Sequence, residues 1–171
     1  SINLADDNEL MDQMVSAGFG KVFVGIETPD EASLAECDKN NNLQRDLIGC
    51  VRRIQTAGME VTAGFLVGFD SVNLGMFQRQ IDFIQTSGIS TAMVGLLNAL
   101  NNTRLYKRLS DEGRILDNSS GDNTGYSINF TPKMDKEVLL DGYQSIIRNI
   151  YSSKAYTERV IHFLKIYEPK I

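Results

Sequence analysis

The sequence predicts an α/β fold built on a parallel β-sheet. Within the first 100 residues an apolar run reaches a polar or glycine-rich end three times, and an amphipathic segment follows each time. The apolar runs cover residues 21–27, 59–70 and 91–98. Parallel strands are buried on both faces and are connected by helices, which produces this alternation. Because ligands bind outside the carboxyl ends of such strands, we expect a functional site at those ends.

The first two helices are expected on either side of the first strand. Residues 6–17 carry apolar side chains on one helical face and stop before a glycine. After the strand, Thr28 is expected to be the N-cap of a short helix, with Pro29 at the first helical position and Glu31 at the third, as in a capping box. This short helix is expected to end near Cys37.

Three longer helices are expected between and after the second and third strands. Their apolar residues recur at spacings of three and four, and each helix is followed by a glycine, the residue preferred just past a helix end. They cover about 43–54, 77–84 and 105–109, and the glycines are Gly58, Gly88 and Gly113.

The composition changes after the third βα unit. Residues 117–125 are rich in Asn, Ser, Asp and Gly, which predicts a surface loop or linker. Two more amphipathic segments, 135–151 and 153–167, are expected to form an appended helical hairpin. We therefore divide the chain into an α/β part, residues 1–115, and a linker with a helical extension, residues 116–171.

Composition excludes several classes of function. The net charge of −5 and the scattered basic residues argue against nucleic acid as a partner. No apolar stretch approaches the roughly 20 residues that span a bilayer, and the first residues lack signal-peptide features, so we expect a cytoplasmic protein without a membrane partner. The two cysteines, Cys37 and Cys50, have no metal-ligand spacing and are expected to be ordinary buried thiols in a reducing compartment.

Several polar and glycine residues have both a functional and a structural interpretation. Glu27 ends an apolar strand, where a carboxylate suits a vicinal diol, but it could equally help to cap the next helix. Gly64 and Gly68 could let a flat ligand approach the second strand or let a helix pack closely on it. We interpret Asp70 as a turn residue rather than a ligand, and His162 as a packed or surface histidine.

The strand ends taken together resemble a known family. The resemblance is carried by Val24-Gly25-Ile26-Glu27-Thr28-Pro29, Lys39, residues 63–70 and 93–100, Thr103, Leu105-Tyr106 and Glu112-Gly113-Arg114. They are similar to the carboxyl-terminal half of a radical S-adenosylmethionine core. The similar class has an N-terminal cobalamin-binding domain in its full-length members, which are often labelled Fe-S oxidoreductases. Residues 1–115 resemble the core closely, and parts of 129–163 resemble an extension found in one branch.

The resemblance implies a partial (β/α) barrel, of which this chain would hold about three βα units, followed by the helical extension. In the family, a CxxxCxxC loop after the first barrel strand holds a [4Fe-4S] cluster, and that loop is absent here. Three thiolates are needed for the cluster, and this chain has two cysteines. The full-length protein would use S-adenosylmethionine, the cluster and cobalamin. We expect none of them bound to this chain, which alone would be catalytically inert.

The resemblance also implies site residues, all of which would bind S-adenosylmethionine. Glu27 resembles the position that contacts the ribose, and Lys39 the basic position that meets the methionyl carboxylate. The positions that lie beside the adenine are matched by Phe65, Val67, Leu97 and Asn98. The Asn101-Asn102 pair departs from the Pro-Gly pair common at that point of the family.

Two other interpretations remain open. A half-barrel could serve as a non-catalytic α/β binding or assembly module, since fold alone does not determine function. A flavodoxin-like domain without its first strand is a third, lower-ranked interpretation. In each case an open half-barrel exposes strand edges, so we expect self-association beside the small-molecule partners, the cofactor and an unknown substrate.

Overall fold

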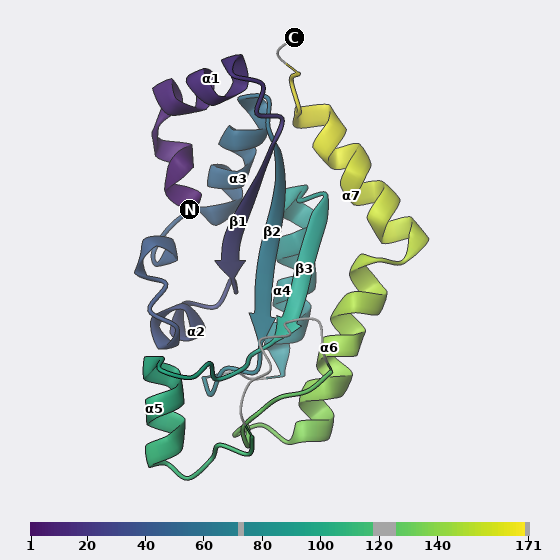
Figure 1. The fold of residues 1–171 in the computed structure, drawn as a ribbon. Coiled ribbons are helices and arrows are strands. Elements are labelled where there is room, and N and C mark those ends of the chain that lie inside the picture. Colours follow the sequence, from purple (N-terminus) through teal and green to yellow (C-terminus); the bar gives the residue numbers. More distant parts are fainter. Residues whose placement is uncertain (72–73, 118–125, 170–171) are drawn as a thin grey trace.

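The computed structural model describes residues 1–71, 74–117 and 126–169. It confirms the α/β class: three parallel strands lie in the order β1-β2-β3, with helices between and after them (Figure 1). The strands are β1 (Lys21–Glu27), β2 (Glu60–Val67) and β3 (Thr91–Leu96). The helices are η1 (Ile2–Asp6), α1 (Asn8–Ser16), α2 (Glu31–Glu36), η2 (Asn40–Asn42), α3 (Leu47–Thr56), α4 (Gly75–Ser87), α5 (Arg104–Asp111), α6 (Lys136–Ile150) and α7 (Ser153–Ile166).

The two faces of the sheet differ. Helices α3 and α4 lie behind the sheet in Figure 1 and cover one face. Buried and half-buried residues alternate along β2, so that Ala63, Phe65 and Val67 face these helices. The opposite face carries Phe23 and Met93, whose side chains remain 58% and 57% exposed. This open face is where the structure leaves room for a ligand or another element.

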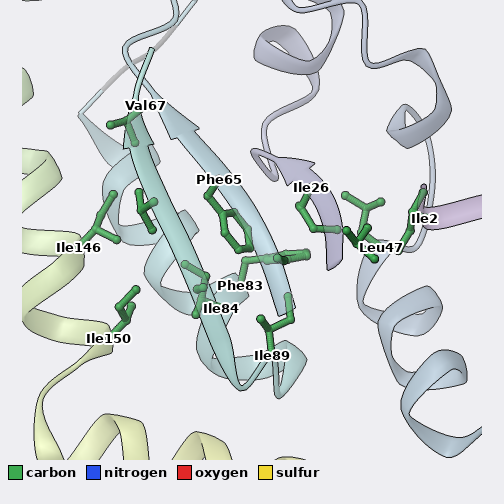
Figure 2. Packing of buried hydrophobic residues seen from close by; sticks show 14 of the residues in the cluster. Ile2, Ile26, Leu47, Phe65, Val67, Phe83, Ile84, Ile89, Ile146 and Ile150 are labelled. Carbon is green, nitrogen blue, oxygen red and sulfur yellow. The ribbon is translucent and has the colours of Figure 1, made fainter. Parts of the chain in front are cut away.

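The apolar core lies between the sheet and its helices, as Figure 2 shows. The rings of Phe65 in β2 and Phe83 in α4 meet edge to face, with centroids 6.0 Å apart. Ile146 and Ile150 of α6 belong to the same core cluster. Since burying each large aliphatic or aromatic side chain contributes roughly 1.5 to 3 kcal/mol, this cluster fixes the positions of the strand ends.

The start of α2 differs from the prediction. Asp30, not Thr28, is the N-cap, and its carboxylate accepts a hydrogen bond from the Ser33 N–H at 3.0 Å. The Thr28 hydroxyl instead accepts from the Asp30 N–H at 3.2 Å. The capping-box prediction was therefore wrong by two residues, because the chain uses Glu27 and Thr28 to turn away from the strand before a helix can begin.

The start of α3 was also predicted too early. The helix begins at Leu47 and is capped by the Asp46 carboxylate, which accepts from the Gly49 N–H at 2.8 Å. Gln44, inside the expected helix, has a φ of +52°. A left-handed residue interrupts the helical hydrogen-bond pattern, and apolar spacing does not reveal it.

The carboxyl-terminal helices do not form the expected hairpin. They follow one another along the β3 side of the molecule (Figure 1), and α6 packs on α4 and β3. Leu139, Ile146 and Ile150 join the core of the sheet, so α6 is an integral layer rather than an appendage. Most of the predicted linker, 117–125, lies outside the described residues. Among the helices of the described ranges, none is long and apolar enough to cross a membrane.

The outer edge of β3 is closed by the α6–α7 junction. The Tyr151 hydroxyl donates to the Ala92 carbonyl at 2.9 Å and accepts from the Ala92 N–H at 3.2 Å. Arg159 of α7, which is fully buried, donates to the Ile150 carbonyl at 2.7 Å and also to Gln85. The Tyr151 contacts satisfy backbone groups that an edge strand would otherwise present to another chain, and the Arg159 contacts hold the α6–α7 junction in place.

Candidate functional site

A cavity of about 520 Å³ lies over the open face of the sheet. Its lining includes three glycines, one from each strand: Gly25, Gly64 and Gly95. Gly25 and Gly64 are direct neighbours in the parallel register. Phe23 and Met93 flank this floor, while the polar residues Glu27 and Asn98 line the cavity from the carboxyl ends of β1 and β3. A floor without side chains can accept a flat ligand in contact with the backbone.

Gly64 and Gly68, in and just after β2, are explained by different structural requirements. A Cβ at Gly64 would lie 3.0 Å from the Phe23 ring, on the cavity side. Gly68 has a φ of +111°, and a Cβ there would lie 3.5 Å from Leu139 of α6. The close-approach interpretation therefore fits Gly64, while Gly68 serves the turn and the packing of a helix.

Glu27 occupies an unusual backbone conformation. Its φ is +69°, and the Thr28 N–H donates to the Ile26 carbonyl at 2.9 Å across it, which makes a tight γ-turn. The buried Asn42 side chain holds this turn, since its Nδ2 donates to the Ile26 carbonyl at 3.0 Å and to the Gly25 carbonyl at 3.3 Å. Positive φ is costly for a residue with a side chain and is found where the surroundings enforce it.

The turn places the Glu27 carboxylate above Gly25 and beside Lys39. The Lys39 Nζ lies 2.8 Å from the Glu27 Oε1, and both side chains keep partial solvent access. A Cβ at Gly25 would lie 2.5 Å from that same oxygen, so a side chain there would displace the Glu27 carboxylate from this position. The structure thus brings together the two polar residues that the family resemblance assigned to one ligand, although they are 12 residues apart.

Of the four other residues predicted to bind the ligand, three line the cavity and one does not. Phe65, Leu97 and Asn98 line the cavity, and Val67 does not. Phe65 and Val67 are buried against the helix layer, so it is Gly64 and Leu66 that face the open side. Phe65 therefore borders the cavity through its backbone, a placement that follows from the two-residue period of a strand.

The Asn98 side chain is engaged by the segment that leads to α6. Its Nδ2 donates to the Ser127 carbonyl at 3.1 Å, and its Oδ1 accepts from the Asn129 N–H at 3.1 Å. The Asn129 side chain in turn exchanges two hydrogen bonds with the backbone of Ala99, at 2.8 and 2.9 Å. These amides fix the carboxyl-terminal segment to the end of β3, at the rim of the cavity.

Asp70 is more than the turn residue that the sequence suggested. Its carboxylate, 8% exposed, accepts hydrogen bonds from Arg114 at 2.6 and 2.7 Å and from Arg108 at 2.6 Å. Burial by itself would raise the pKa of Asp70, but the two guanidinium groups outweigh it and lower the pKa to about 2. Glu36 joins the cluster through Arg108, at 2.8 Å.

The Asp70 cluster was missed for a physical reason. Asp70 lies 38 residues from Arg108 and 44 from Arg114, so no local spacing rule connects them. The signal present in the sequence was a charged residue at the end of a buried strand, which requires some partner. The cluster ties α2 and α5 to the end of β2 and does not line the cavity over the open face.

The described residues hold no group of three or more His, Cys, Asp or Glu that could bind a metal ion. Both cysteines are free thiols; Cys50 is buried as predicted, whereas Cys37 is only half-buried. The Cys50 sulfur is buried and accepts from the Arg45 Nε and the Arg53 Nη2, each at 3.1 Å. His162 is half-buried and packs over Gly88, in agreement with the packed-histidine interpretation. The donors present therefore do not fit an iron–sulfur cluster.

Comparisons with known proteins match the chain along nearly its whole length. It is 40% identical over 172 residues to the "Uncharacterized methyltransferase sll1242" of Synechocystis sp., which covers 99% of this chain and 32% of that protein. It is 31% identical over 159 residues to the "Hopanoid C-2 methylase" of Rhodopseudomonas palustris, covering 93% of this chain and 29% of that protein. A family model described as "Domain of unknown function (DUF4070)" matches residues 103–171.

These matches show that the chain is homologous to a segment of two longer proteins, one named as a methyltransferase and the other as a methylase. The chain spans about a third of the length of the two relatives. The matched domain of unknown function includes α5, α6 and α7, and therefore Asn129 and the residues that close the edge of β3. The boundary of this domain falls inside the βα pattern, just before α5.

Proposed function

We propose that this chain is the carboxyl-terminal half of a radical S-adenosylmethionine core within a longer, cobalamin-dependent methyltransferase of the Fe-S oxidoreductase type. Its role there is to supply the nucleoside side of the S-adenosylmethionine site. The observation that carries the proposal is the Glu27 carboxylate, held by a strained turn over a glycine floor and beside Lys39. Active sites are where backbone strain of this kind accumulates.

Each group has a role suited to its chemistry. The Glu27 carboxylate, which only accepts hydrogen bonds when ionised, would bind the two ribose hydroxyls. The Lys39 ammonium, now paired with Glu27, would also pair with the methionyl carboxylate of the ligand. The floor of Gly25 and Gly64 would accept the flat purine, and Leu97 and the backbone of Phe65 would border it.

The cofactors divide between this chain and the rest of the protein. The polar pair and the glycine floor fit S-adenosylmethionine, which supplies a radical or a methyl group once its sulfonium is cleaved. The cluster that drives the cleavage needs three thiolates, which this chain does not contain. The cluster, the cobalamin and the substrate contacts would lie elsewhere in the longer protein, so this chain alone would be inert.

The open edge of β1 supports a larger barrel. Within the ranges that the structure describes, β1 pairs with β2 on one side and with no strand on the other. An edge strand presents unpaired backbone groups to which another strand can bind, and the relatives are about three times as long as this chain. Preceding strands of the longer protein would continue the sheet from β1 and cover Phe23.

A titration of the chain with S-adenosylmethionine, followed by amide NMR shifts, tests the proposal. The isolated chain is not expected to retain S-adenosylmethionine, but at high ligand concentration a half-site should still give weak, saturable shifts at Gly25, Gly64 and Gly95. The Glu27→Gln variant should bind about 10- to 100-fold more weakly, because a hydrogen bond to a charged group contributes about 1.5 to 3 kcal/mol. Its melting temperature should stay close to that of the unchanged chain.

The matched control is Glu60→Gln. Glu60 is also an ion-paired strand glutamate, 3.1 Å from Lys21, but it lies at the amino end of β2 and outside the cavity. Its replacement should leave S-adenosylmethionine affinity unchanged. A Glu27→Gln chain that loses stability but keeps its affinity would assign Glu27 a structural role. An unchanged chain that shows no saturable shifts would contradict the proposed function and favour a non-catalytic module.

A further inference from the structure

Helix α6 contributes to the core and to the cavity at once. Tyr143 and Ile147, four residues apart and therefore on one side of the helix, line the cavity over the open face of the sheet. Leu139, Ile146 and Ile150 lie in the core cluster shared with the strands. The domain of unknown function thus places two side chains against the same space that Glu27, Gly25 and Gly64 line from the strands.

The position of this wall is fixed by close packing. A Cβ at Gly142 would lie 2.3 to 2.5 Å from three atoms of the Phe77 ring in α4, so the two helices approach through a glycine. The Tyr143 ring meets the Tyr126 ring edge to face, with centroids 5.4 Å apart. A side chain held in this way presents its polar atom at a defined place, which is what selective binding requires.

The Tyr143 hydroxyl has no hydrogen-bond partner among the residues that the structure describes, although the side chain lines the cavity and the residue is only 7% exposed. Burial, with a smaller effect from Tyr126, raises the pKa of Tyr143, so the hydroxyl keeps its proton at neutral pH. The hydroxyl is not among the fully buried polar atoms, so it is open to the cavity that the side chain lines, where a ligand atom can reach it and supply a hydrogen-bond partner.

We infer that α6 of the domain of unknown function forms one wall of the nucleoside cavity, with Tyr143 as a specificity-determining residue whose hydroxyl donates a hydrogen bond to a ring nitrogen of a bound purine. Ile147, on the same wall of the cavity, packs against the same heteroaromatic ring. This inference rests on the proposed function and extends it: the segment after the third βα unit belongs to the binding site itself, in addition to closing the edge of β3.

The test is an S-adenosylmethionine titration of the full 171-residue chain, read by NMR for contacts between ligand and protein protons. We expect intermolecular NOEs from the adenine protons to the Ile147 methyl groups and the Tyr143 ring. Tyr143→Phe should weaken binding about 3- to 10-fold, the range expected for one neutral hydrogen bond, without lowering the melting temperature. Ile147→Trp should fill the cavity and abolish binding.

Two variants serve as matched controls. Tyr156→Phe removes a tyrosine hydroxyl from α7, and Val138→Trp adds an indole to an exposed position of α6; neither residue lines the cavity. Both should bind like the unchanged chain. Normal binding with shifts at Glu27 and Gly64, but without NOEs to α6 and without an effect of Tyr143→Phe, would overturn this inference and leave the proposed function standing. No binding by the unchanged chain would overturn both.

Discussion

The two outer edges of the sheet differ in whether other residues cover their backbone groups. At β3, the Tyr151 hydroxyl bonds both backbone groups of Ala92, and the α6–α7 junction lies alongside, secured by the buried Arg159. At β1, the described residues provide no partner strand, and the Phe23 side chain on the adjoining face is 58% exposed. One edge is closed to further pairing, and the other is available for it.

Under the proposed function, this difference indicates the edge from which the sheet would continue in a longer protein. The side chains that close this edge, Tyr151 and Arg159, follow β3 in the chain and lie within the matched domain of unknown function. The open edge belongs to the first strand of the chain, and the longer relatives have sequence beyond this segment. A barrel that grows from β1 and ends at β3 agrees with both observations, and each edge can be tested separately.

The largest effect is expected from opening the closed edge. Arg159→Met keeps the length of the side chain but removes the donors to the Ile150 carbonyl and to Gln85. Leaving these groups buried without partners should lower the free energy of unfolding by about 3 kcal/mol. Urea unfolding measures the change. The control Arg148→Met, at an exposed position of α6, should change it by less than about 0.5 kcal/mol. Equal effects of the two variants would mean that Arg159 does not secure this edge.

A smaller loss of stability is expected on acidification, and it should arise at the Asp70 cluster rather than at the closed edge. The pKa of Asp70 falls from its ordinary 3.8 to about 2, so its ionised form stabilises the folded chain at pH values above 3.8. That contribution, about 2 kcal/mol, should be lost as the pH falls from 4 through 2, because protonation removes the pairing with Arg114 and Arg108. No carboxylate takes part in the described contacts of Arg159, so the closed edge should keep its protection from amide exchange over the same range.

The acid prediction is checked by unfolding curves for the unchanged chain and for Asp70→Asn between pH 6 and pH 2.5. The variant should be less stable at pH 6 and should lose less stability on acidification. Asp141→Asn, at an exposed position of α6, is the control and should behave like the unchanged chain. Identical pH dependence in all three chains would remove Asp70 from the account of acid stability.

The parts of the fold that the sequence predicted are those with local causes. Strand β1 was predicted with the bounds that the structure gives it, and the glycine after α4 ends that helix with a φ of +68°. The missed features depend on distant contacts. Asp70 finds its arginines across the fold, and α6 packs its apolar residues on the sheet because of where the preceding segment is fixed by Asn129.

In the candidate site, too, some features could be predicted from the sequence and others depend on contacts between distant residues. Family resemblance placed Glu27 and Lys39 on one ligand, and the structure brings them within hydrogen-bond distance, but the γ-turn held by Asn42 leaves no signal in apolar spacing. The contribution of Tyr143 was likewise invisible, since a tyrosine in an amphipathic helix reads as an ordinary core residue. Side chains from separate elements meet only in three dimensions.

The smallest effect on stability, and the sharpest test of the open edge, should come from Phe23→Lys. Because the Phe23 side chain is largely exposed, its replacement should change the free energy of unfolding by less than about 0.5 kcal/mol. We nevertheless expect it to shift the chain from self-associated to monomeric, since a lysine on an edge strand discourages pairing with another copy. The measurement is sedimentation velocity over a range of concentrations.

The matched control is Ile161→Lys. It replaces an apolar residue of α7 that is 47% exposed and lies beyond the closed edge, and it should leave association unchanged. If both variants reduce association equally, the chains associate through exposed apolar residues in general and not through the β1 edge. If the unchanged chain is a monomer at every concentration, the β1 edge does not mediate association in solution.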